Sequence, residues 1–134
     1  MDTSKEYILM CEKAVEIQTI WKKDGTKSGD FIKVHGYEIC VISSHEAGAW
    51  SDHWIWIPRQ DQLQEMAYDG KIKSFPVLQW SFYLFLLERN EDWRNIRKRG
   101  DDEKKYSSFE KVWLSYLMRH KFNKTWNGED WING

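Results

Sequence analysis

The sequence is poor in cysteine, carries no excess of charge of one sign and contains no long apolar run. Cys11 and Cys40 are its two cysteines, and their wide spacing favours free thiols over a disulfide framework. The longest apolar stretch, 75–87, is interrupted by polar residues and is too short to span a bilayer. The first residues show no basic start followed by an apolar run, so no signal peptide is expected. Together these absences predict a cytoplasmic protein that does not bind membranes.

Charge and motifs exclude further classes. The 20 basic and 21 acidic residues leave a net charge of −1, whereas sequence-independent nucleic-acid binders usually carry a basic excess. The sequence contains no G-x-S-x-G, G-x-x-x-x-G-K-[ST] or G-x-G-x-x-G segment. The common hydrolase, phosphate-loop and dinucleotide sites therefore lack their loops, and no cofactor is expected.

Aromatic residues are abundant by contrast. They make up 16% of the 134 residues, and nine of them are tryptophan. A chain of this length, 41% apolar and 31% charged, fits a single globular domain over residues 1–134. Tryptophan buries a large area and has one N–H that needs a partner. So many tryptophans predict an aromatic core, an aromatic-lined recess or an adhesive interface.

The apolar pattern predicts an α+β fold with an N-terminal helix, a three-stranded antiparallel sheet, three C-terminal helices and a short terminal hairpin. Thr3 and Glu6 have the spacing of a capping box, and helical spacing continues to about residue 24. β-Branched and aromatic residues over 31–43 indicate two short strands, or one strand bent at Gly36. Short, closely spaced strands favour an antiparallel meander.

The segment 53–58, HWIWIP, predicts a third strand that ends at Pro58. Alternation places Trp54 and Trp56 on one side and two isoleucines on the other. Because both sides are apolar, we expect this strand to be central in the sheet and covered on both faces.

Three helices are expected after Pro58. The first covers 59–68, and the second, over 74–87, is apolar nearly all round, which is typical of a buried central helix. A mixed-charge segment, 88–106, reads as a solvated loop. The third helix begins at a second capping-box pattern, Ser107 with Glu110, and Asn127-Gly128 then predicts a hairpin.

Two stretches carry a resemblance to known proteins: WIPRQDQLQEM (56–66) and FEKVWLSYLMRHKFNKTWNGEDWI (109–132). They resemble small accessory proteins encoded by phages and prophages of Gram-positive bacteria, with Ile57 where leucine is expected. The first helix and the Gly-Asp pair at 29–30 agree loosely. The resemblance implies action in the host cytoplasm, and it transfers no catalytic residue because these proteins have no assigned activity.

Several chemistries are weighed against simpler interpretations. Asp52-His53 followed by Pro58 has a wider spacing than HNH-type nucleases need, so these residues are expected only to begin a strand. A larger set offers metal ligands but lacks the paired spacing of zinc sites: His35, Cys40, His45, Glu46 and His53. A metal-dependent hydrolase is accordingly the third and weakest hypothesis, and no metal ligand is assigned.

Two further clusters also have simple interpretations. Cys40 paired with a histidine resembles a nucleophile and base, but a thiol in an apolar strand is usually inert. Asp61 and Glu65, four residues apart, share a helix face and are typical of a solvated surface. No catalytic residue is therefore assigned.

The leading hypothesis is a non-enzymatic protein that binds a host or phage protein and can self-associate. Aromatic residues near arginine are typical interface anchors. The alternative is an aromatic pocket for a small nucleotide or a nucleic acid, supported by Trp93 within a local basic cluster but opposed by acidic neighbours. The tryptophans on helices, Trp21, Trp80 and Trp113, are expected in the core. The predicted contact residues are Trp50, Trp54, Arg59, Trp93, Trp126 and Trp131.

Overall fold

A computed structural model describes residues 1–36, 38–49, 51–96 and 107–134, with side chains throughout except at 89–96. Its secondary structure confirms the mixed α and β composition and the three-stranded antiparallel sheet. The elements are α1 (Lys5–Lys13), α2 (Val15–Asp24), β1 (Phe31–Lys33), β2 (Ile39–Val41), β3 (Ile55–Ile57), α3 (Gln60–Ala67), α4 (Phe75–Ile96), α6 (Phe109–Phe122), β4 (Lys124–Trp126) and β5 (Trp131–Asn133).

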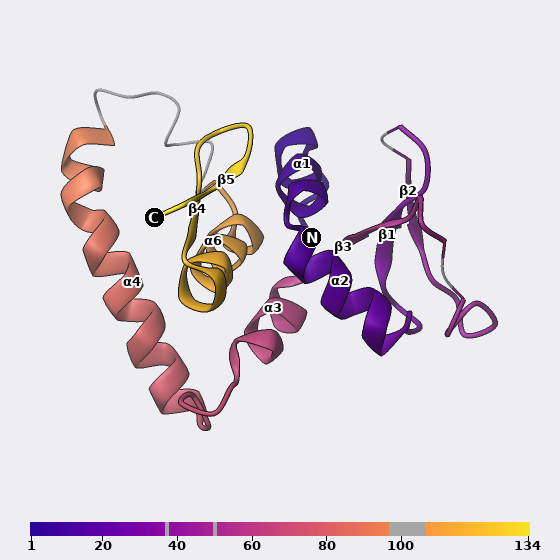
Figure 1. Ribbon diagram of the computed structural model, residues 1–134, viewed down its shortest axis with the longest axis horizontal. Coiled ribbons are helices and arrows are strands. Elements are labelled where there is room, and N and C mark those ends of the chain that lie inside the picture. Colours follow the sequence, from indigo (N-terminus) through magenta and orange to yellow (C-terminus); the bar gives the residue numbers. More distant parts are fainter. Residues whose placement is uncertain (37, 50, 97–106) are drawn as a thin grey trace.

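The molecule is elongated, with the sheet at one end and α4 at the other (Figure 1). Helices α1, α2, α3 and α6 and the β4–β5 hairpin occupy the space between these ends. The buried apolar side chains come from all of these elements and form one continuous core. None of the described helices combines the length and hydropathy needed to cross a bilayer.

The N-terminal helix, expected as one element, is two. It breaks at Ala14, whose ψ of 68° departs from helical geometry while its N–H bonds to the carbonyls of Met10 and Cys11. The cap is Ser4 rather than the expected Thr3, because the Ser4 hydroxyl accepts the main-chain N–H of Tyr7. The buried residues keep one helical spacing across the break, from Tyr7 and Cys11 on α1 to Ile17 and Trp21 on α2.

The strand order is β2-β1-β3, which makes β1 central. The expected meander and the expected central position of the third strand are therefore wrong. β3 pairs on one side only, with Trp56 opposite Ile32 in the register. Trp56 and Ile57 are nevertheless buried, as their apolar alternation indicated, because helices cover this edge strand. The residues on both faces of β3 are therefore apolar because helices cover the strand, and not because the strand is central in the sheet.

The free edge of β3 is completed by a side chain. Gln18, on the buried face of α2, accepts the main-chain N–H of Trp56 through Oε1 (2.9 Å). Its amide nitrogen donates to the carbonyls of Trp56 (2.9 Å) and Cys11 (3.0 Å). One glutamine thus occupies the position of a neighbouring strand and also satisfies a carbonyl beside the break between α1 and α2.

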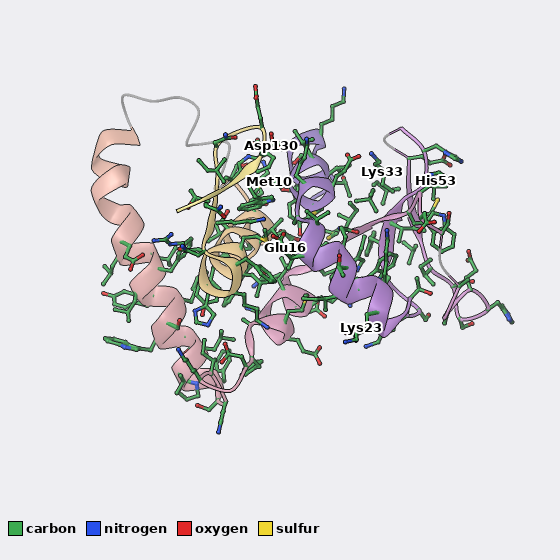
Figure 2. All side chains as sticks on the ribbon, viewed as in Figure 1. Met10, Glu16, Lys23, Lys33, His53 and Asp130 are labelled. Atoms are coloured by element: carbon green, nitrogen blue, oxygen red, sulfur yellow. The ribbon has the colours of Figure 1, made fainter. Side chains whose placement is uncertain are left out.

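At the other end of the chain, α6 leads into the hairpin. Its cap is Ser108 and not the expected Ser107, since the Ser108 hydroxyl accepts from Lys111 N. The hairpin predicted at Asn127-Gly128 is confirmed, with four residues between the paired Trp126 and Trp131. Trp131 donates its indole N–H to the carbonyl of Met10 (2.9 Å). Figure 2 shows Met10 and Asp130 in the region where the hairpin adjoins α1.

We predict that Gln18→Leu, which keeps the side-chain volume, lowers the free energy of unfolding by roughly 3–5 kcal/mol, because it leaves the buried N–H and carbonyl of Trp56 without partners. Urea unfolding followed by circular dichroism measures the change. Thr19→Ala, at the adjacent exposed position, serves as the control and should change stability by no more than about 0.5 kcal/mol. Equal stability of the two variants would contradict the role assigned to Gln18.

Candidate functional site

Asp30 organises a recess between α2, α3 and the loop that precedes β1. Asp30 is 2% exposed. Oδ2 accepts the indole N–H of Trp21 and the main-chain N–H of Lys27, both at 2.9 Å, and Oδ1 accepts from Nε2 of Gln62 at 2.7 Å. The carboxylate thereby joins α2, the loop that follows it and Gln62 of α3, which lies 32 residues further along the chain.

Arg59 holds the other side of this arrangement. Its Nη1 donates to the carbonyl of Gly29 (2.6 Å), and its Nε and Nη2 donate to the two oxygens of Asp61 (3.0 and 3.2 Å). Gly29 has a φ of 89°, a conformation that favours glycine. The main-chain N–H of Arg59 donates to Gln62, which closes the first turn of α3. The Gly-Asp pair and the R-Q-D-Q segment therefore form one hydrogen-bonded unit.

The recess has a volume of about 460 Å³. Its buried aromatic wall is formed by Trp21 and Trp56, whose rings are 5.9 Å apart and nearly parallel. Both charge signs line it: Asp24, Lys27, Asp30, Arg59, Asp61, Glu65 and Lys121. Because the two indole rings stack on each other and are almost fully buried, they leave little ring face for a planar ligand.

The carboxylate pair of α3 is explained by this geometry. Asp61 is exposed and chelated by Arg59, which lowers the pKa of its carboxyl. Glu65 lines the same recess. The arrangement therefore supports the expected surface role of the pair.

We expect Asp30→Asn to destabilise the protein by roughly 1–3 kcal/mol, because an amide supplies one acceptor oxygen where the carboxylate uses two, and a buried donor then lacks a partner. The matched variant, Asp61→Asn, removes charge from an exposed ion pair and should cost less than about 1 kcal/mol. Urea denaturation of both variants tests this, and a larger loss for Asp61→Asn would refute the assignment.

A second candidate surface is the outer face of α4. Six large apolar side chains in the described part of this helix are exposed, and Trp80, at 62%, is the most exposed of them. They are Phe75, Val77, Trp80, Tyr83, Leu84 and Leu87. The expectation that this helix is central and that Trp80 belongs to the core is wrong. In Figure 1, α4 forms one end of the molecule, and no other described element lies beyond it.

The opposite face of α4 binds it to α6 through aromatic rings. Phe82 stacks on Trp113 with ring centroids 4.0 Å apart, and Phe85 meets the Tyr116 ring edge-on. The hydroxyls of Ser81 and Tyr116 are 2.7 Å apart. α4 also continues to Ile96, so residues 88–96 are helical and not the expected loop. The helix is thus anchored on one side and open on the other.

The turn before α4 is fixed by Asp69. Its Oδ1 accepts the main-chain N–H groups of Lys71 and Ile72, both at 2.7 Å, and Oδ2 is 3.3 Å from Nε2 of His120 on α6. Hydrogen bonds from Ile72, Lys71 and His120 lower the pKa of the Asp69 carboxyl to about 2. This carboxylate therefore links the start of α4 to α6.

Because the folded pKa of Asp69 lies below its ordinary value of 3.8, the ionised carboxylate stabilises the fold above that value. The contribution is lost as the pH falls toward about 2. We predict that wild type is more stable than Asp69→Asn at pH 5 and that this difference shrinks as pH falls through that window. Urea unfolding at stepped pH measures it, and a difference that stays constant with pH would contradict the prediction.

The predicted contact residues do not gather in one place. Arg59 lines the recess, and Trp54 is half-buried and packs against the core. Trp126 and Trp131, expected to be exposed, are buried, because their rings pack together at the hairpin and Trp131 bonds to α1. The side chain of Trp93, on α4, and all of Trp50 lie outside the described residues.

The candidate metal and nucleophile groups remain dispersed. His35 and His45 are exposed in turns, Cys40 lies on β2, and Glu46 bonds to Ser43. Figure 2 places His53 beside the sheet, far from α4. Within the described ranges no three His, Cys, Asp or Glu side chains are arranged to hold a metal ion.

Comparisons with protein-family models, with curated proteins and with solved structures found no match to this chain.

Sequence reasoning missed two features that the structure brings out. Gln18 has a recognisable signal, because it shares the apolar helix face of Ala14, Ile17 and Trp21, where a polar residue needs a partner. The open face of α4 has no such sequence signal. An apolar stripe that contacts a partner has the same spacing as one that contacts the core of its own chain.

Proposed function

We propose that this protein is non-enzymatic and acts by binding other protein chains through the outer face of α4. The observation that carries the proposal is the run of exposed apolar side chains on that face, with Trp80 near its middle. A group of neighbouring exposed apolar side chains on one helix face is typical of an interaction site, because such a surface is unfavourable in water.

The chemistry of the face fits a protein partner. Over 75–88, α4 carries one charged residue, Glu88, which lies at the end of the stripe. Depletion of charge at the centre and enrichment in tryptophan and tyrosine are characteristic of protein interfaces. Phe82 and Phe85 pack one side of the helix against α6, so the opposite side is the one presented to a partner.

The recess supports small-molecule binding less well. A nucleotide site needs an aromatic face and convergent polar groups. Here Trp21 and Trp56 stack against each other, and Arg59 and Asp61 are paired. Together with the resemblance of 56–66 and 109–132 to phage and prophage proteins, these features favour an accessory protein that works through protein contacts.

The test is differential capture in a Gram-positive bacterial host. Tagged wild type should retain at least one protein in near-stoichiometric amount, and the double variant Trp80→Glu/Leu84→Glu should lose it, because charges on an apolar contact disfavour its desolvation. Val15→Glu places the same charge at an exposed apolar position on α2 and should retain the protein.

Circular dichroism and thermal melts establish that all three chains fold. Recovery of the same proteins by all three would overturn the proposal, and so would recovery of none by a wild type that also stays monomeric.

A further inference from the structure

The outer face of α4 has the spacing of a helix-pairing seam. Val77, Trp80, Leu84 and Leu87 follow one another at intervals of three, four and three residues. This is the spacing of the a and d positions through which helices pair in coiled coils. All four side chains are exposed, and the anchored residues Leu78, Phe82 and Phe85 occupy the opposite side of the helix.

We infer that the occupant of this seam is a second copy of the same chain, packed antiparallel across a two-fold axis. The inference rests on the proposed function, since it uses the same surface, and it names the partner. The seam is symmetric about position 82: Val77 and Leu87 are equally distant from it, as are Trp80 and Leu84. An isologous interface requires this self-complementarity.

In the antiparallel arrangement large residues meet smaller ones. Trp80 packs against the partner's Leu84, and Val77 packs against the partner's Leu87, so each layer holds one a and one d residue. A parallel pair would instead place Trp80 against the partner's Trp80, which fills the central layer with two indole rings and leaves the neighbouring layers smaller.

The charges near the ends of the paired segment also favour the antiparallel direction. The first turn of α4 carries no acidic residue, and Lys73 precedes it. Antiparallel pairing about position 82 brings the partner's Glu88 level with Pro76, where the positive end of the helix dipole and Lys73 attract a carboxylate. Parallel pairing would leave both Glu88 carboxylates about three helical turns away from that positive end.

The first test is the mass of the purified wild-type chain by light scattering over a concentration series. A concentration-dependent dimer is expected, and Trp80→Glu/Leu84→Glu should raise its dissociation constant by roughly 30-fold or more, as loss of a central aromatic anchor does. Val15→Glu should leave it unchanged. A wild type that stays monomeric at its highest soluble concentration overturns the inference, and so does a dimer that the double variant leaves intact.

Direction is tested by disulfide formation in a Cys40→Ser background, which leaves only buried Cys11 among the native thiols. Trp80→Cys and Leu84→Cys are prepared separately, one with a size tag, and are mixed before mild oxidation. Antiparallel pairing predicts mainly the mixed product, because two copies of position 80 are offset by four residues, about 6 Å along the axis. Predominant self-linked products would overturn the antiparallel arrangement.

Different results would contradict the proposed binding through α4 and the proposed self-pairing through α4. If the purified chain is monomeric while the host capture still depends on Trp80 and Leu84, the partner is another protein, so the proposed function stands and self-pairing is refuted. If the chain dimerises but neither dimer nor capture responds to the double variant, the outer face of α4 is not the binding surface and both proposals fail.

Discussion

The side-chain amide of Gln18 connects the two helices at the start of the chain to the sheet. It joins α2 to the carbonyl at the end of α1 and to both main-chain groups of Trp56 on β3. A strand whose edge is left unpaired in an apolar interior is costly, because each main-chain group has lost its water. The same contact holds Trp56, whose ring stacks on Trp21 in the wall of the recess that Asp30 organises.

Local elements were predictable where one short-range rule decides them. The α3 helix, the two strands around Gly36 and the hairpin at Asn127-Gly128 depend on neighbouring residues, and the structure confirms them. Strand order was not predictable, because the apolar alternation around Trp56 is the same whether a strand or a helix covers its second side. The two capping serines were each missed by one residue, since adjacent hydroxyls at 3–4 and at 107–108 offer the same chemistry.

The candidate site was predictable in part. Arg59 was identified from its sequence neighbours, and its hydrogen bonds to Gly29 and Asp61 give the motif a structural explanation. The open face of α4 lay outside the prediction because periodicity reports that a residue is apolar and not what covers it. A helix that is apolar all round is unfavourable in water. Because the described part of this chain leaves one side of α4 exposed, we propose that a second chain covers it.

The hairpin has a consequence for the order of folding. The indole of Trp131 bonds to Met10 across 121 residues, and Lys111 reaches Glu6 across 105. Contacts between such distant positions close late, because the entropy of bringing the two segments together comes before any stabilisation that they supply. A ribosome must therefore release most of the chain before α1 meets α6 and the hairpin. During that interval the contacts open to α1 are those with α2 and β3, which lie in the first part of the chain.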